Sequence, residues 1–313
     1  MVQKRKLALN GMELAMLVYG LITTIMILIY WNNLNQALEK IELRGILFTW
    51  IAVGAFVIPK IKIHEKIKAG LRTFPYMIAL IWLYPETYDF CSQFPYLDHV
   101  FAEIDRTLFG CQPALLFDKL MPETFWSEAF CMGYYAYYYL MAAVILFYLL
   151  CRYQQFDKAC FIFLGTFFMF YLVYDFLPVA GPQYYFCALQ ELGINYDNIT
   201  EYPALGDYFK THTNMIAPEV KGIFSQLVTH AHEVGERPTA AFPSSHVGMS
   251  TISMILAWKS NNKWLFWILM PIFILLCCGT VYIKAHYLID SISGFIIAFI
   301  FYYAIRWVGK KIY

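Results

Sequence analysis

The stretch TAAFPSSHVGMS, residues 239–250, places two serines and a histidine directly before an apolar run. A second stretch, YIKAHYLIDSISG, residues 282–294, places a histidine and an aspartate before another apolar run. Ionisable groups inside membrane segments are costly, and they usually serve a function. The two stretches therefore predict a membrane protein with a polar site at the ends of two spans.

The composition agrees with a membrane protein. Of the 313 residues, 60% are hydrophobic and only 14% are charged. We expect an all-α fold, a polytopic bundle of about six to eight transmembrane helices, because several apolar runs approach the length that crosses a bilayer core. We expect the bundle to form a single integral membrane domain over residues 1–313. The expected spans lie near residues 12–31, 46–59, 72–88, 127–150, 159–178, 243–258, 264–283 and 286–307.

The distribution of basic residues predicts the orientation. Lysine and arginine accumulate in cytoplasmic loops, and if the N-terminus is inside, the inner segments hold 15 of the 23 basic residues. Both termini then lie in the cytoplasm, and both histidines face the other side of a bacterial inner membrane or a eukaryotic endomembrane. The net charge of +1 gives no support for nucleic-acid binding.

Two long outer segments, residues 90–126 and 179–242, precede the motif-bearing helices of residues 243–307. The first contains YLDHVFAEIDRTLFG, residues 96–110, whose apolar residues fall at helical spacing. We predict an amphipathic helix lying at the membrane interface. Cys91 and Cys111 both fall in or beside this segment, and the sequence leaves open whether they pair.

A tyrosine-rich run, YYAYYYL, lies in the fourth expected span at residues 134–140. Tyrosine is enriched where spans meet the membrane surface. We interpret the run as an interfacial anchor rather than as a substrate contact.

The spacing of polar residues predicts chemistry. His286 and Asp290 are four residues apart, so on a helix they share a face. The aspartate could accept the Nδ1 proton of the imidazole and present its other nitrogen as a nucleophile or base. Near His246, Ser244 and Ser245 suit a helix start, where free N–H groups favour an anion. We therefore expect a phosphate cradle with two histidines, one attacking phosphorus and the other protonating the departing oxygen.

These residues resemble the signature motifs of the type 2 phosphatidic acid phosphatase (PAP2) superfamily. PSSH is similar to its P-S-G-H motif, and HYLID to the end of its S-R-x5-H-x3-D motif. The resemblance implies that His286 is the nucleophile and forms a phosphohistidine, that Asp290 orients it, and that His246 is the acid and base. It also implies catalysis without a metal or another cofactor.

The departures from the motifs point to one branch of the superfamily. Gly279 and Thr280 stand where the third motif has Ser-Arg, and His230 stands where the first motif has lysine. Arg237 and Pro238 match the end of the first motif, so Arg237 is a candidate phosphate ligand beside Ser244 and Ser245. The branch that lacks these basic residues includes inositol phosphorylceramide synthases and the similar sphingomyelin synthases, and the chain resembles it.

We therefore expect a lipid head-group phosphotransferase with a phospholipid donor and a ceramide or diacylglycerol acceptor. The first alternative is a lipid phosphate phosphatase that uses the same residues with water as acceptor. The second alternative is a transporter in which His246, His286 and Asp290 form a proton relay or bind a metal. The sequence shows no inverted repeat of the kind common in secondary transporters.

Overall fold

The computed structural model describes residues 9–196 and 199–312, and within these ranges every regular element is a helix. The prediction of an all-α fold is confirmed. The elements are α1 (Gly11–Ile29), α2 (Ala37–Ala52), η1 (Val53–Val57), η2 (Ile58–Lys60), α3 (Glu65–Leu71), α4 (Phe74–Cys91), α5 (Asp98–Phe109), α6 (Pro113–Leu120), α7 (Thr124–Tyr135), α8 (Tyr137–Cys151), α9 (Tyr153–Phe176), α10 (Pro182–Glu191), η3 (Tyr208–Lys210), α11 (Ile223–Gly235), α12 (Ser245–Lys259), α13 (Lys263–Tyr282) and α14 (Leu288–Ile312).

Among the described residues, five helices are long and apolar enough to cross a membrane, and α7 with α8, bent by 45°, adds a sixth if the pair forms one span. The protein is an integral membrane protein with five or six candidate spans; six is the lowest number in the expected range, and five lies below it. Two expected spans differ from these. The α4 helix, with Pro85 inside it, is not among the candidate spans. The α12 helix has only 15 residues, about 22 Å, which is short of a bilayer core of about 30 Å.

The second span begins earlier than predicted. It covers residues 37–60 instead of 46–59, so Arg44 lies inside it rather than in an outer loop. The Arg44 side chain is buried and forms a two-pronged ion pair with Glu86 of α4, with Nη1 at 3.2 Å from Oε1. The predicted span began after Arg44 because a charged residue interrupts an apolar run. A membrane span can contain such a charge when an oppositely charged side chain lies beside it.

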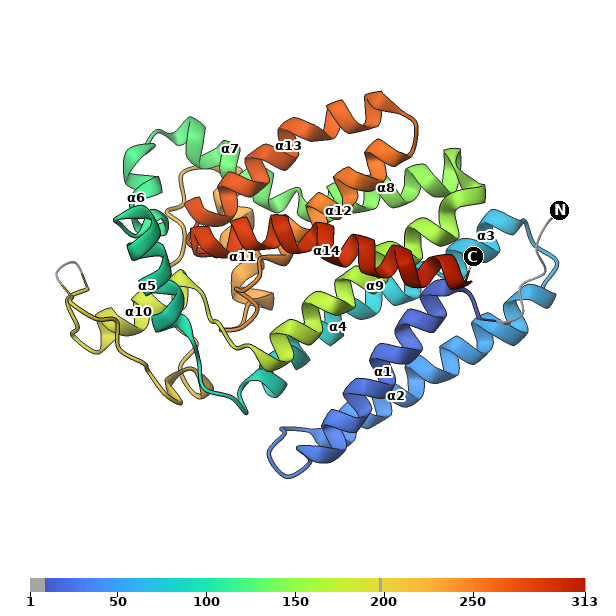
Figure 1. Cartoon of the computed structure of the whole chain (residues 1–313), viewed down its shortest axis with the longest axis horizontal. Coiled ribbons are helices and arrows are strands. Elements are labelled where there is room, and N and C mark those ends of the chain that lie inside the picture. The colour runs from blue at the N-terminus through green and yellow to red at the C-terminus, as the bar shows by residue number, and fades with distance from the viewer. Residues whose placement is uncertain (1–8, 197–198, 313) are drawn as a thin grey trace.

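Short helices lie at both ends of the molecule (Figure 1). The short helices α5, α6 and α10 gather at one end, and α3 lies with the C-terminal end of α14 at the other. The helices α7 and α13 pack closely: a Cβ added at Gly279 of α13 would lie only 2.5 Å from the carbonyl oxygen of Phe130 of α7. Small residues allow membrane helices to approach in this way.

The α5 helix occupies the predicted amphipathic segment, but aspartates as well as apolar residues attach it to the protein. Val100 and Leu108 remain exposed, as an interfacial helix requires, while Phe101 is buried. On the buried side, Asp98 and Asp105 accept hydrogen bonds from backbone N–H groups of two distant segments. The helix therefore packs against the start of α14.

Residues 179–242 form α10, η3 and α11, which fold over the same end of the bundle. Glu128 of α7 accepts the N–H groups of Phe224 and Ser225 at the start of α11. No disulfide joins Cys91 to Cys111. Cys91 and Cys111 are both free thiols, and Cys91 Sγ lies 3.2 Å from Thr239 Oγ1.

Candidate active site

The two histidines meet although 40 residues separate them. His246 lies in the first turn of α12, and His286 lies in the short connection between α13 and α14. His286 Nε2 is 3.4 Å from His246 Nδ1, and the ring centroids are 5.6 Å apart. The structure thus brings together the two residues that the sequence assigned to the nucleophile and the acid.

The Nδ1 proton of His286 is held by a backbone carbonyl rather than by Asp290. His286 Nδ1 is 2.8 Å from the carbonyl oxygen of Ala241, whereas Asp290 Oδ2 is 3.9 Å away. Because a carbonyl oxygen only accepts, Nδ1 carries the proton and Nε2 keeps its lone pair. The expected tautomer is present. The prediction that Asp290 accepts the Nδ1 proton is wrong, because helical spacing does not show that the segment containing Ala241 folds back onto His286.

Asp290 instead fixes the loop that carries His286. Its Oδ2 accepts the N–H of Tyr287 at 2.9 Å. Asp105 of α5 accepts the next two N–H groups, those of Leu288 at 2.8 Å and Ile289 at 3.0 Å. The first N–H groups of a helix lack partners within the helix, so two carboxylates satisfy the start of α14 and hold His286 in place.

Asp98, two turns before Asp105 on the same face of α5, holds the neighbouring loop. It accepts the N–H groups of Ala180 and Gly181 and the hydroxyl of Tyr287. Burial raises the pKa of Asp98 to about 7, and its hydrogen bonds oppose that rise. Neither aspartate was predicted from the sequence; their spacing of seven residues, two helical turns, was the one available signal.

Burial also sets the protonation of His286. The side chain is 4% exposed, and burial lowers the pKa of His286 to about 4. At neutral pH the imidazole is therefore uncharged, the form that a nucleophile requires.

The two serines differ in their surroundings. The Ser244 hydroxyl caps α12 by accepting the N–H of Val247 at 3.3 Å, and the Ser244 N–H bonds the Asp290 carbonyl at 3.0 Å. A Cβ at Gly294 would lie 2.4 Å from the Ser244 carbonyl oxygen, so glycine permits this contact between α12 and α14. Ser244 acts as a cap, and Ser245 is the serine that lines the cavity beside the histidines.

The cavity beside the histidines is small, about 20 Å³. Among the described residues, no lysine or arginine lines it. The Arg237 side chain is exposed and donates to the carbonyl of Glu236 at 2.8 Å. It therefore does not lie in the cavity, where a phosphate ligand was expected. Lys284 forms an ion pair with Asp118. The lining residues are Tyr84, Tyr134, Ala180, Gln183, Glu236, Thr239, Ala240, Ala241, Ser245, His246, Ala285 and His286.

Glu236 brings a carboxyl group into this cavity, and sequence reasoning missed it. Its oxygens lie 3.3 Å from the Tyr84 hydroxyl and 3.5 Å from the Tyr134 hydroxyl. Burial raises the pKa of Glu236 to about 7, although both hydroxyls oppose the shift. His232 is 2% exposed with its ring against Tyr134, and burial lowers the pKa of His232 to about 4.

The tyrosine-rich run divides between two surroundings. The Tyr134 ring stacks on His246 with centroids 4.5 Å apart, and Tyr137 lies at the same distance. Tyr138 and Tyr139 are exposed by more than half. The interpretation as an interfacial anchor fits the exposed pair alone, because successive helical residues point in different directions.

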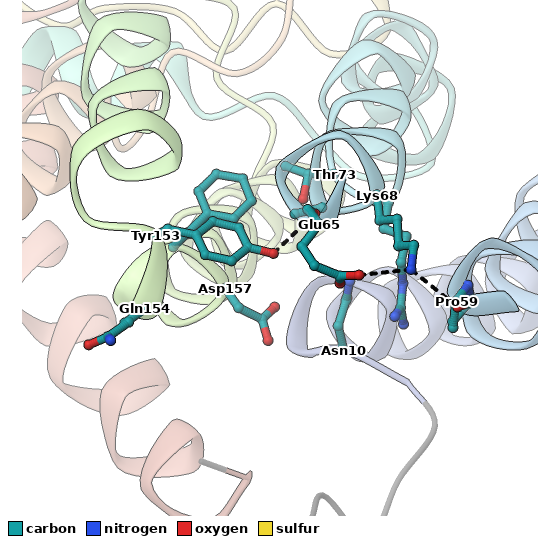
Figure 2. Close-up of a pocket in the computed structure, with 11 residues that line it drawn as sticks. Asn10, Pro59, Glu65, Lys68, Thr73, Tyr153, Gln154 and Asp157 are labelled. Atoms are coloured by element: carbon teal, nitrogen blue, oxygen red, sulfur yellow. Dashed lines mark hydrogen bonds and ion pairs between the residues drawn. The ribbon is translucent and has the colours of Figure 1, made fainter. Parts of the chain in front are cut away.

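A larger polar cavity of about 480 Å³ lies near the opposite end of the bundle, between α3 and the start of α9 (Figure 2). Lys68 there bonds Glu65 at 2.8 Å, and the Tyr153 hydroxyl bonds the Glu65 carbonyl at 3.0 Å. Its lining residues include no histidine. Size alone therefore does not mark the reactive site.

A comparison with family models shows a match to the PAP2 superfamily over residues 99–304, which is most of the chain. The match begins within α5 and includes both histidines, Asp105 and Asp290. No curated protein and no solved structure matches the chain.

Proposed function

The chain belongs to the PAP2 superfamily, and from that premise we propose that it transfers a phosphate-linked head group from a phospholipid to a lipid hydroxyl through His286. Membership supports an enzyme of the lipid phosphatase and phosphotransferase type, and therefore weighs against the transporter. The acceptor is a ceramide or diacylglycerol, as in the branch that the motifs resemble. The site faces the extracytoplasmic side, with both termini in the cytoplasm.

The first half of the reaction uses the tautomer described above. His286 Nε2 forms a bond to phosphorus while the bond from phosphorus to the diacylglycerol oxygen breaks. His246, protonated, gives its proton to that leaving oxygen. Burial and the neighbouring histidines lower the pKa of His246, and the negative charge of the phosphodiester opposes this and favours the protonated form as the substrate arrives.

The second half reverses these roles. The acceptor hydroxyl attacks the phosphohistidine, its proton passes to His246, and the bond from Nε2 to phosphorus breaks. Asp105 and Asp290 hold the loop, and the Ala241 carbonyl holds the imidazole proton throughout. Ser245 and the start of α12 are the proposed phosphate ligands, since a helix N-terminus stabilises an anion; Ser244 contributes by capping the helix and Arg237 is the remaining basic candidate.

The observation that carries the proposal is the charge of the cavity. A terminal phosphate carries nearly two negative charges, and cationic side chains suit its binding. This cavity has no lysine or arginine among its described lining residues, and it contains the Glu236 carboxyl group. A phosphodiester carries one negative charge, so its charge suits the residues that line this cavity better than the charge of a phosphate monoester does.

One observation favours the phosphatase alternative. The cavity of about 20 Å³ has room for a water molecule beside the histidines. A water in that place could attack the phosphohistidine before a lipid hydroxyl does. The two functions differ in the acceptor and not in the residues.

The test is turnover of purified protein in vesicles. We expect a phospholipid donor with ceramide or diacylglycerol to give a new phosphodiester lipid faster than free head-group phosphate, measured by lipid mass spectrometry. The His286→Ala variant should give neither product. His212→Ala, which removes an exposed histidine of the outer segment, is the matched control and should retain activity.

Phosphatidic acid supplies the opposing result. Rapid hydrolysis of phosphatidic acid without any modified acceptor lipid would establish the phosphatase and defeat the transferase. Activity that survives His286→Ala would defeat both, because both need the same nucleophile.

A further inference from the structure

An apolar groove of about 810 Å³ runs between α13 and α14. The α6 helix covers one end of the groove, and Val247 of α12 contributes to its floor. Its walls include Phe273 and Cys277 of α13 and Ile292 and Phe295 of α14. This volume lies within the range of pockets that bind small organic molecules.

The groove lies beside both histidines. Val247, which lines it, directly follows His246, and Leu288, which also lines it, is two residues after His286. The small polar cavity and the large apolar groove thus border the same two helix starts. A molecule with a phosphate beside the histidines can extend an apolar part toward the groove.

The depth of the groove matches one leaflet of a bilayer. Its lining extends from Val281 to Phe273 on α13, about 12 Å along the helix axis. Half of a bilayer core is about 15 Å. The exposed Trp264 and Trp267 mark the opposite end of α13, where such residues meet a membrane surface. The groove therefore lies in the leaflet nearest the histidines.

The lining of the groove is mostly apolar. The Ser291 hydroxyl, a polar group in the lining, is 2.9 Å from the Thr280 hydroxyl. Both helices that form the groove are candidate membrane spans, so the groove opens where hydrocarbon chains surround the protein.

We propose that the groove holds one acyl chain of the phospholipid whose phosphate lies beside His246 and His286. The inference rests on the proposed function only in placing a phosphate there, and a phosphatase would use the groove in the same way. Lipid chains are as apolar as the groove, so the groove adds little affinity. Its contribution is orientation, because a chain fixed beside the helix starts places the phosphorus near Nε2.

Cross-linking tests the occupant without any turnover. The full-length His286→Ala protein is placed in vesicles with a phosphatidylcholine that carries a diazirine on one acyl chain, and cross-linked peptides are mapped by mass spectrometry. We expect cross-links concentrated in residues 273–296. Cys277→Trp, which fills the groove, should lose most of them. Ile274→Trp is the matched control, since Ile274 is 53% exposed on the same helix and does not line the groove.

Turnover with the active enzyme gives the second measurement. Cys277→Trp should lower kcat/KM about tenfold or more for a long-chain donor, because the phosphorus is displaced from the nucleophile. The same variant should keep its kcat/KM for a water-soluble donor with a short chain, which does not need the groove. Ile274→Trp should match the wild type with both donors.

Two results would overturn the inference. Cross-links spread evenly over all lipid-facing helices would show that the groove does not select a chain. Equal losses for long-chain and short-chain donors would show that the tryptophan disturbs the histidines instead. Failure of transfer with cross-links still confined to the groove would defeat the transferase alone and support the groove as a lipid site.

Discussion

Buried carboxylates in the N-terminal helices and near the histidines are held by different partners. In the N-terminal helices each is paired with a cation: Glu86 with Arg44, and Glu13 with Arg72. Near the histidines they accept backbone N–H groups, as Asp98, Asp105 and Asp290 do. Asp175 of α9 belongs to neither group, since neither of its oxygens has a hydrogen-bond partner among the described residues.

The two arrangements have different structural effects. An ion pair makes a charge tolerable inside a bundle and joins two helices. A carboxylate that binds backbone N–H groups fixes a loop and brings no cation with it, so it can position His286 while the cavity stays free of lysine and arginine. The family match begins at residue 99, so Glu13, Arg44 and Glu86 lie outside it, whereas Asp105 and Asp290 lie within it.

The strongest test of this difference is Asp105→Asn. The amide would lose one acceptor and turn an N–H donor toward the start of α14. We expect turnover to fall about 100-fold, because a small displacement of His286 suffices, and the free energy of unfolding to fall by about 1–3 kcal/mol. Both are measured on purified protein, by product formation and by thermal unfolding in detergent.

Glu103→Gln is the control on the same helix, since Glu103 forms only a partly exposed ion pair with Arg106. It should change stability by less than about 1 kcal/mol. Full turnover in Asp105→Asn would show that α5 does not position the nucleophile.

Asp290→Asn should have a smaller effect. A triad aspartate that accepts the imidazole proton directly loses about 10⁴-fold in turnover on this change. Here the Ala241 carbonyl accepts that proton, and an asparagine oxygen can still accept the Tyr287 N–H. We expect about a tenfold loss, as for groups that support a reactive residue indirectly. A loss as large as that of the triad would mean that Asp290 itself acts on His286 during the reaction.

The pH profile separates the two buried groups in the site. Since the pKa of His286 is lowered to about 4, its lone pair persists down to that pH and is lost below it, so activity should fall there. The pKa of Glu236 is raised to about 7, so the carboxyl group ionises as pH rises through 7 and repels an anionic donor. We expect KM to rise several-fold across this range in the wild type and to stay constant in Glu236→Gln. A rise that persists in the variant would assign it to another group.

The smallest effect on turnover is expected from the N-terminal ion pair. Arg44→Met or Glu86→Leu alone should destabilise the fold by about 3–5 kcal/mol, because each leaves an unpaired buried charge. The double variant should recover most of that loss, and its turnover per folded molecule should equal that of the wild type. A double variant that folds but lacks activity would show that the two regions are coupled.

Local patterns in the sequence determined much of this protein. Apolar runs indicated most of the membrane helices, and PSSH and HYLID indicated where α12 and α14 begin, each beside a histidine. Both signals act within a few residues: helix length follows from a run of apolar residues, and a serine before such a run suits a helix start.

The tertiary structure decided which groups surround those residues. The Ala241 carbonyl reaches His286 from 45 residues away, and Asp105 reaches the start of α14 from more than 180 residues away. Arg44 lies inside a span because Glu86 of another helix neutralises it. Glu236 enters the cavity because α11 and the chain after it fold over the site. These contacts join segments far apart in the chain, so no periodicity encodes them, and only the packing of the helices brings the atoms together.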